Sequence, residues 1–457
     1  MITRLALLAF AVAAALAVAP EARAQDTADD VVGAWSAEED YFRAVILIER
    51  GAGGALAAFF SDDGRARGAP LSGAEVRGDS LFLDAEAVGA AFRGAVSGDG
   101  STIRGTWTQG AQSVPLTLTP VGAPARAATT DEPATNGPAP YPSEEVAFDS
   151  APGVVLAGTL TVPEGAGPFP AVVLLQGSGL SDRDAEVGGH RTFEILADHL
   201  TRSGVAVLRY DKRGGGRSTG DAGAVGLGDL AEDAEAAVRF VRGRSGVDPD
   251  RVGLVGHSEG ALVAPVAAGP AEAAFLVLLM PPATPTGPAL VEQNVELAAA
   301  SGAPPPVVES VRSMMDRVVA AAGSDADSVA VAAEIRSAFA DSGLSGDALD
   351  ASVRAHTSLL FRDIARYDPG PALRAVEMPT LAVLGSLDLF VPDENEDALR
   401  ASLGDRGTVH VAEGVNHWLQ PATTGLPDEI ARIEETVAPA VLSVITEWIV
   451  GQRLDGQ

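Results

Sequence analysis

Hydrophobic and polar residues alternate in short runs between residues 31 and 120, and the runs end in turns rich in glycine, aspartate and serine. Such runs are typical of antiparallel strands with one buried face. We expect strands at 43–49, 55–60, 80–84, 91–96, 101–108 and 113–118. The pattern predicts a small all-β domain over 31–120, as a barrel or a sandwich. A linker rich in alanine, proline and threonine follows at 121–142.

The pattern changes after residue 142. An antiparallel pair is expected at 145–148 and 154–162. Apolar runs at 171–175, 205–208, 252–255, 275–280, 381–384 and 409–411 then alternate with helix-like stretches. This alternation predicts an α/β domain over 143–450, with a mostly parallel sheet and helices on both faces. The helix-like segment 281–376 interrupts it, and we expect a helical cap there, above the carboxyl ends of the strands.

The N-terminus reads as a targeting signal. Arg4 precedes an apolar run at residues 5–18, and Ala22-Arg23-Ala24 forms a small-residue cleavage site. Because the apolar run is shorter than the roughly 20 residues that span a bilayer, it predicts a cleavable signal peptide over residues 1–24. The mature protein is therefore expected to be secreted or periplasmic, with no membrane span.

The composition of the chain limits the classes of molecule that it is expected to bind. The formal net charge is -30, and Lys212 is the only lysine among 32 lysine and arginine residues. This acidity argues against nucleic acid and anionic membranes as partners. The chain has no cysteine, which excludes disulfides, a cysteine nucleophile and a lipid-modified cysteine.

The strongest local motif is Gly256-His257-Ser258-Glu259-Gly260, between a strand-like run at 251–255 and a helix-like run at 261–268. A serine on a sharp strand-to-helix turn needs small residues two positions before and after it. The free N–H groups at the helix start can also stabilise negative charge. This context predicts Ser258 as an acyl-forming nucleophile.

The same pattern occurs a second time, as Gly216-Arg217-Ser218-Thr219-Gly220. It lies in a glycine run, and Asp221-Ala222-Gly223 follows it instead of a helix. We interpret it as a glycine-rich loop.

A serine nucleophile needs a base to take its proton and a carboxylate to orient that base. Among six histidines, His417 stands out because it lies in a loop directly after the last strand. Asp388 follows the preceding strand, although it could also cap the helix after it. The order Ser258, Asp388, His417 is the one expected for a triad on such a sheet. His257 is expected to point away from the serine.

The first parallel strand ends in Gly177-Ser178-Gly179. A glycine-rich chain here can direct a backbone N–H at the reacting carbonyl oxygen, so the Ser178 and Glu259 N–H groups are the expected oxyanion hole. The alternative is a glycine loop that only turns the chain.

These segments together resemble the bacterial secreted α/β-hydrolase carboxylesterases related to the serine aminopeptidase branch. The resemblance covers residues 141–449. It rests on the oxyanion loop running into Asp182-Arg183-Asp184, the Ser258 motif, residues 208–214, Gly385-Ser386-Leu387-Asp388, and Asn416-His417 followed by Gln420-Pro421. It implies an α/β-hydrolase fold, a β-rich N-terminal domain, and structural roles for Asp211 and Arg213. Leu180 departs from the proline that the family often has there.

The resemblance implies a serine carboxylesterase that cleaves small-molecule esters with short to medium acyl chains, through an acyl-enzyme. A serine aminopeptidase or prolyl peptidase of the same fold, a lactonase and a thioesterase stay open, because the triad does not separate them. A non-catalytic binding protein is the remote alternative. No motif implies a metal or an organic cofactor. For the β-rich domain, packing, oligomerisation as a homodimer and ligand binding all stay open.

Overall fold

The computed structural model describes residues 31–39, 42–50, 56–61, 71–77, 80–85, 90–97, 102–109, 112–120, 139–392 and 394–452. The predicted signal peptide and residues 121–138 of the predicted linker lie outside the described residues. The chain separates into two compact units, residues 1–131 with 336–355 and residues 132–335 with 356–457. The domain boundaries expected from the sequence stay predictions.

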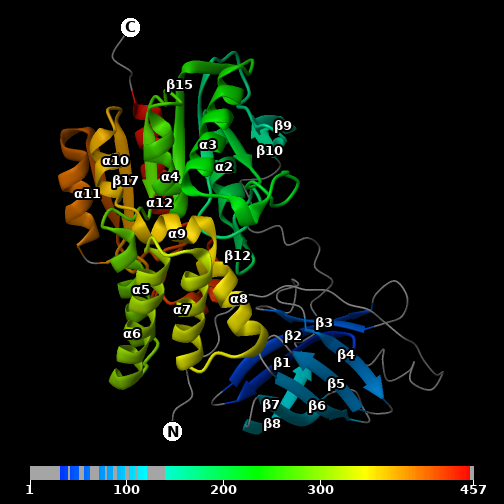
Figure 1. The fold of residues 1–457 in the computed structure, drawn as a ribbon. Coiled ribbons are helices and arrows are strands. Elements are labelled where there is room, and N and C mark those ends of the chain that lie inside the picture. The colour runs from blue at the N-terminus through cyan, green and yellow to red at the C-terminus, as the bar shows by residue number, and fades with distance from the viewer. Residues whose placement is uncertain are drawn as a thin grey trace. The chain divides into compact units, whose positions relative to one another are not determined.

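The first unit holds one eight-stranded antiparallel sheet in the order β3-β2-β1-β8-β7-β6-β5-β4. Its strands are β1 (Gly33–Glu39), β2 (Phe42–Arg50), β3 (Leu56–Ser61), β4 (Gly73–Arg77), β5 (Ser80–Ala85), β6 (Ala90–Val96), β7 (Ile103–Gln109) and β8 (Gln112–Pro120). The sheet curls around a core that includes Trp35, Ile46 and Phe92 (Figure 1). Its edge strands β3 and β4 lie against each other, and Leu71 N–H donates to Ala58 O at 2.8 Å. A single curled sheet favours the barrel over the sandwich among the described residues.

The second unit is built on an eight-stranded sheet in the order β18-β17-β16-β15-β11-β14-β10-β9. The strands are β9 (Ser143–Ala151), β10 (Val154–Thr161), β11 (Phe169–Leu175), β14 (Ala206–Tyr210), β15 (Val247–His257), β16 (Leu276–Leu279), β17 (Thr380–Gly385) and β18 (Gly407–Ala412). β9 and β10 pair antiparallel, and the strands from β14 to β18 run parallel to β11. A short pair, β12 (Glu186–Val187) and β13 (His190–Arg191), stands apart. The predicted mostly parallel sheet, with an antiparallel pair at its start, is confirmed.

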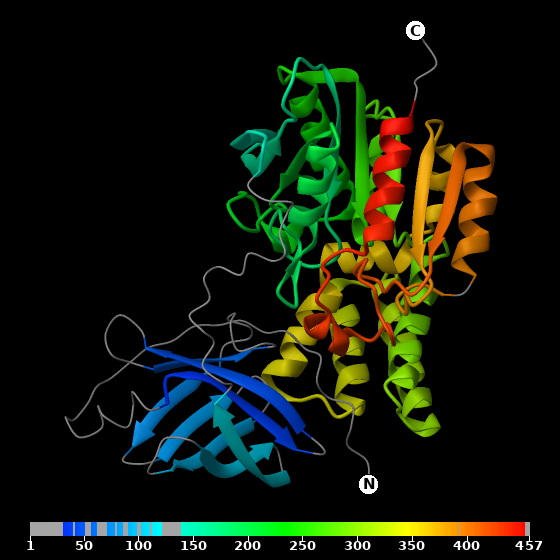
Figure 2. The ribbon, with the colours of Figure 1, turned by 180° about the vertical axis from the view of Figure 1, so that it is seen from behind.

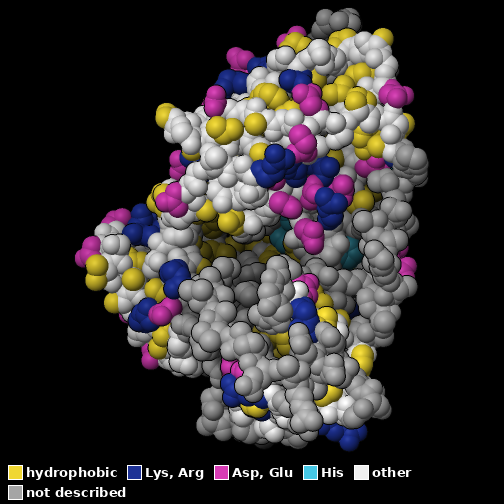
Figure 3. All heavy atoms as spheres, turned by 90° about the vertical axis from the view of Figure 1, so that its right-hand side faces the viewer, with side chains coloured by type: hydrophobic (Ala, Val, Ile, Leu, Met, Phe, Trp, Pro, Cys, Tyr) yellow, Lys and Arg dark blue, Asp and Glu magenta, His cyan; other side chains and the backbone are white. Residues whose placement is uncertain are grey.

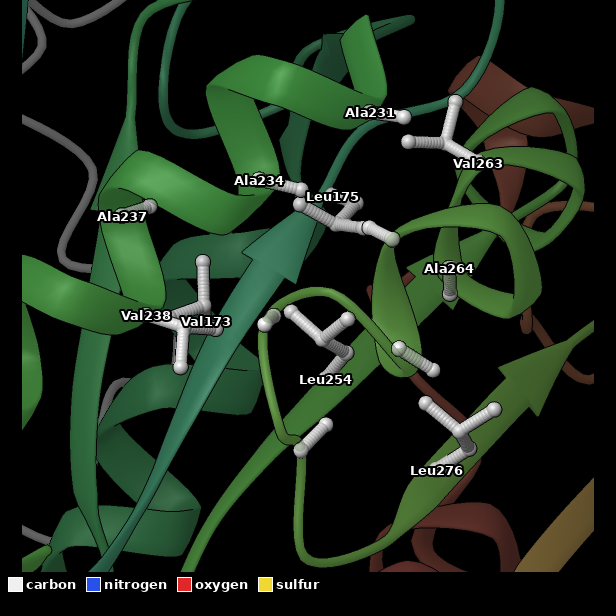
Figure 4. Close-up of a cluster of buried hydrophobic side chains, with 14 of the residues drawn as sticks. Val173, Leu175, Ala231, Ala234, Ala237, Val238, Leu254, Val263, Ala264 and Leu276 are labelled. Carbon is white, nitrogen blue, oxygen red and sulfur yellow. The ribbon is translucent and has the colours of Figure 1, made fainter. Parts of the chain in front are cut away.

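Helices cover both faces of this sheet because its central strands bury both faces. Along β11, Val173 and Leu175 pack with α3 (Leu227–Arg242) and α4 (Glu259–Ala268). Val172 and Leu174 pack in a second core with α2 (Thr192–Arg202) and α12 (Pro439–Gly451). Helix α12, in red, lies over the sheet in Figure 2. In the first of these cores, small α3 side chains such as Ala234 and Ala237 lie close to the strands (Figure 4). Helix α11 (Asn395–Leu403) adds Leu399 to the same core.

Between β16 and β17 the chain forms α5 (Thr286–Ala300), α6 (Pro305–Ala322), α7 (Ser328–Asp341), α8 (Gly346–Thr357), α9 (Leu359–Arg366) and α10 (Pro369–Ala375). α9 packs against α5 and α6, and Asp363 of α9 accepts a hydrogen bond from Leu227 N–H at the start of α3, 3.0 Å away. α10 packs instead against α4 and α11, in the helix layer beside the sheet. The cap itself stays a prediction.

Ion pairs tie loops of the second unit together. Arg183, after β11, contacts Asp211 at 2.9 Å and Glu145 of β9 at 2.8 Å. Arg213 contacts Asp233 of α3 at 2.7 Å. These contacts fit the structural roles expected for Asp211 and Arg213. Basic and acidic side chains also lie next to one another on the face seen in Figure 3. Within the described ranges, no helix combines the length and the apolar character that crossing a membrane requires.

Candidate functional site

Ser258 lies between the end of β15 and the start of α4, in a strained backbone conformation with φ 54° and ψ -113°. Its N–H donates to Leu279 O of the neighbouring strand at 2.9 Å, which fixes the turn on the sheet. A Cβ on Gly256 would overlap the Gly260 carbonyl, and a Cβ on Gly260 would overlap the Leu175 carbonyl. The glycines are therefore required by the close approach of backbone to backbone.

The three residues predicted as a triad come together at the carboxyl ends of the strands. His417 Nε2 lies 2.9 Å from Ser258 Oγ, in position to accept its proton. His417 Nδ1 lies 2.9 Å from each of the two Asp388 carboxylate oxygens. The Asp388 side chain is fully buried and that of His417 is 7% exposed. Because the carboxylate accepts a hydrogen bond from Nδ1–H, Nε2 is left as the acceptor that faces the serine.

Backbone contacts join the loops that carry Asp388 and His417. Leu387 N–H donates to Val415 O at 3.0 Å, and a Cβ on Gly385 would overlap that carbonyl. Asn416 is fully buried, and its Oδ1 accepts from Trp418 N–H and Gln420 N–H, each at 3.0 Å. The loop around His417 is thereby held from both ends.

Two aromatic residues that the sequence did not single out pack against the histidine. The Phe390 ring stacks on the His417 imidazole with ring centres 4.5 Å apart and planes at 20°. Trp418 meets both rings edge-on, at 5.0 and 5.6 Å. These contacts limit the orientations of the imidazole. Phe390 lies two residues after Asp388, yet no local motif marks its stacking.

The predicted oxyanion loop lies beside the serine. A Cβ on Gly177 would stand 3.4 Å from Ser258 Cβ, so the loop passes within van der Waals contact of the nucleophile. Ser178 follows on the exposed side, and Glu259 is the first residue of α4. The first N–H groups of a helix have no intrahelical partner, which suits Glu259 N–H for the expected role.

His257 contacts the site in a way that the sequence did not predict. It does not contact Ser258 Oγ, and its Nε2 lies 2.8 Å from the His417 carbonyl oxygen. Burial, together with the nearby His417, lowers the pKa of His257 to about 4. The ring therefore stays neutral near neutral pH and donates its Nε2–H to this carbonyl.

This low pKa makes folding stability depend on pH. Between the ordinary pKa of 6.5 and the folded pKa of about 4, the unfolded chain binds the proton and the folded chain does not. We expect His257 to lower the free energy of unfolding by about 3 kcal/mol as pH falls through this window. His257→Gln keeps a side-chain N–H donor but does not titrate. As pH falls, the free energy of unfolding of this variant should therefore decrease by about 3 kcal/mol less than that of the wild-type protein. Urea unfolding of the wild-type protein and of the variant at pH 7 and pH 4 measures these decreases. Equal decreases in the two proteins would contradict the low pKa of His257.

Ser218, in the second motif match, has a different environment. Its Oγ donates to Asp211 O at 2.6 Å and accepts from Ala157 N–H at 2.9 Å. The first bond lies within the loop after β14, the second joins that loop to β10, and neither partner is a base. This agrees with its interpretation as a loop serine.

No group of three or more histidine, aspartate or glutamate residues suited to a metal ion occurs in the part of the chain that the structure describes.

The sheet order, the turn that carries Ser258 and the Ser258–His417–Asp388 contacts define an α/β-hydrolase. A family model described as serine aminopeptidase, S33, matches residues 189–420, just over half of the chain. The chain therefore belongs to the serine aminopeptidase S33 family.

Two curated relatives match part of the chain. Esterase EstD of Thermotoga maritima is 28% identical over 266 residues, which are 58% of this chain and 58% of EstD. The uncharacterized protein MT2364 of Mycobacterium tuberculosis is 34% identical over 152 residues, which are 32% of this chain and 50% of that protein. The chain thus spans only about half of the length of these relatives. Among solved structures, the DcsB complex with its substrate analogue has a TM-score of 0.44 at 19% identity, covering 68% of this chain and 99% of that chain.

Proposed function

We propose that the protein is a carboxylesterase that forms an acyl-enzyme on Ser258. His417 takes the serine proton while the serine oxygen attacks the ester carbonyl, and Asp388 stabilises the imidazolium that forms. The negative oxygen of the tetrahedral intermediate lies at the Ser178 and Glu259 N–H groups. His417 then protonates the leaving alcohol, and water repeats the sequence to release the acid. The 2.9 Å approach of Ser258 Oγ to His417 Nε2 is the observation that carries this proposal.

An aminopeptidase needs a carboxylate near the serine to hold the substrate amine. Helices α5 and α6 of the cap segment carry four acidic residues, Glu292, Glu296, Glu309 and Asp316, and all four are exposed. Glu292 is also engaged by Arg312 at 2.5 and 2.8 Å, and this hydrogen bond holds the pKa of Glu292 below its usual range. An exposed carboxylate is a poor anchor for a free amine, and the charge of Glu292 is already paired. This favours ester substrates, with the similarity to a protein named an esterase in support.

A matched pair of substrates tests this choice. The p-nitrophenyl esters of butyrate and of 2-aminobutyrate have the same carbon chain and differ only in the amine. Because the ammonium group also activates the neighbouring carbonyl, each kcat/KM is divided by the rate constant of the same ester with hydroxide. Without an amine anchor, we expect this ratio for the butyrate ester to equal or exceed that for the amino ester. A ratio that is tenfold or more higher for the amino ester would instead support the peptidase. Butyryl thioester and γ-butyrolactone in the same assay measure the thioesterase and lactonase alternatives.

We further propose that the protein acts outside the cytoplasm, after removal of residues 1–24. Support comes from the Arg4 segment, the apolar run and Ala22-Arg23-Ala24. N-terminal sequencing of the protein from a secreting host should begin at Gln25, and an intact Met1 would contradict the proposal.

A further inference from the structure

Lys212 contacts both segments that carry the expected oxyanion-hole donors, Ser178 N–H and Glu259 N–H. Its Nζ donates to Gly177 O at 2.6 Å and to Glu259 Oε1 at 2.8 Å. The Lys212 and Glu259 side chains are only 9% and 3% exposed. A single buried ammonium group therefore links the loop after β11 to the first residue of α4.

The contact between Lys212 and Gly177 O also determines the direction of the Ser178 N–H group. Gly177 C=O and Ser178 N–H belong to one planar peptide unit, in which the oxygen and the hydrogen point in opposite directions. Holding the carbonyl on the Lys212 side therefore turns the N–H to the other side. This peptide rotates through ψ of Gly177 and φ of Ser178, and Gly177 has no side chain to restrict its ψ. Without the Lys212 contact, little would therefore hold the plane of the peptide.

The second contact of Lys212 fixes the side chain of Glu259, the residue that carries the other expected donor. Glu259 supplies the other expected N–H, and its carboxylate is fixed by the same ammonium group. A buried ion pair contributes little net stability, because the cost of removing both charges from water offsets their attraction. Stability alone therefore gives a weak reason for a charged pair at this position, whereas holding the Gly177 carbonyl in place against the first residue of α4 gives a specific one.

The chemistry of lysine fits this position better than that of arginine. The chain uses arginine at every other basic position, so this one lysine stands against its overall composition. An ammonium group is compact and donates hydrogen bonds in several directions, whereas a guanidinium group is a wide planar fork. The two acceptors here belong to different segments, which suits the compact group.

We propose that Lys212 is a positioning residue that sets the oxyanion hole by orienting the Ser178 peptide group and holding its loop against Glu259, the residue of the second donor. The inference rests on the proposed function, because it assumes that these two N–H groups face the reacting oxygen.

The test compares Lys212→Met with the wild-type protein. Methionine keeps an unbranched apolar side chain but cannot donate. Removing one oxyanion donor typically lowers kcat by about 10²- to 10³-fold, and we expect a loss of that size for p-nitrophenyl butyrate, with KM nearly unchanged. Inhibition by a butyl trifluoromethyl ketone, which forms a tetrahedral adduct with serine, should weaken by a similar factor. The pH at which activity falls on the acid side should not move, since the base is untouched.

A double variant separates orientation from the penalty of an unpaired charge. Lys212→Met with Glu259→Gln removes both charges, so no buried carboxylate is left alone. We expect it to be more stable than the single variant, in thermal unfolding, and equally impaired in kcat. Arg202→Met, which removes a partly buried ion pair of α2 with Asp198, is the matched control and should keep the wild-type kcat.

The outcomes are distinct. Recovery of kcat in the double variant, or an unchanged kcat in folded Lys212→Met, would overturn the inference, as would a change in KM alone. If Lys212→Met does not fold, the double variant decides. Labelling of Ser258 by a fluorophosphonate reports serine reactivity whatever the natural substrate. Slow labelling of the Lys212 variants beside normal wild-type labelling therefore supports the inference even if the ester is not hydrolysed, and equal rates would contradict it.

Discussion

Replacing Ser258 by alanine is expected to lower kcat for p-nitrophenyl butyrate by about 10⁴- to 10⁶-fold. Alanine keeps the Cβ, so the strained turn at φ 54° and its glycine contacts should persist, and the melting temperature should stay close to that of the wild-type protein. The loss is chemical, because no other hydroxyl has His417 Nε2 within hydrogen-bond distance among the contacts of the described residues. Steady-state kinetics with circular dichroism measures both quantities.

Two further variants make this result specific. Ser218→Ala changes the serine of the other G-x-S-x-G match and removes two loop hydrogen bonds, so it should cost about 2 kcal/mol of stability while kcat is retained. Ser258→Ala combined with His417→Ala should be no slower than Ser258→Ala alone, because the two groups act as one unit. A loss of activity in Ser218→Ala that matches that of Ser258→Ala would refute the assignment.

Replacing Asp388 by asparagine is expected to lower kcat by about 10⁴-fold with little change in KM. Asp388 Oδ1 accepts from Phe390 N–H at 2.8 Å, so the asparagine carbonyl oxygen should keep that place and leave the amide NH₂ toward His417 Nδ1. A donor there turns the imidazole into the tautomer that presents Nε2–H to Ser258. The base is then unable to take the serine proton.

The exposed Asp397 on α11 gives a matched control, since Asp397→Asn makes the same chemical change away from the site. We expect wild-type kinetics from it. An Asp388→Asn protein with more than a tenth of the wild-type kcat would show that His417 does not depend on this carboxylate.

Sequence patterns predicted the strands of the α/β sheet because buried parallel strands are continuous apolar runs. The same patterns missed β1 and β4 of the first unit. β1 ends in acidic residues, and β4 has the sequence Gly-Ala-Glu-Val-Arg. Neither segment has a strong strand preference, and both are held by pairing with neighbouring strands, a tertiary effect that local sequence does not carry.

Some residues of the candidate site could likewise be predicted from the sequence, and others could not. Ser258, Asp388 and His417 follow strands, so their proximity could be predicted from the strand order. The roles of Lys212, His257 and Phe390 could not, because their contacts join distant segments or depend on how rings stack. Lys212 and Gly177 are 35 residues apart, and His257 and His417 are 160 apart. No spacing rule connects such pairs.

The most direct test of the account is the position of a covalent label. A fluorophosphonate reacts with an activated serine, and the label is located by peptide mass spectrometry after trypsin. Arg239 and Arg251 lie between Ser218 and Ser258, so the two candidate serines fall on different peptides. The account predicts one label per chain, on Ser258, that is lost in Ser258→Ala and in His417→Ala. A label on Ser218, or no label on wild-type protein that is folded, would contradict it.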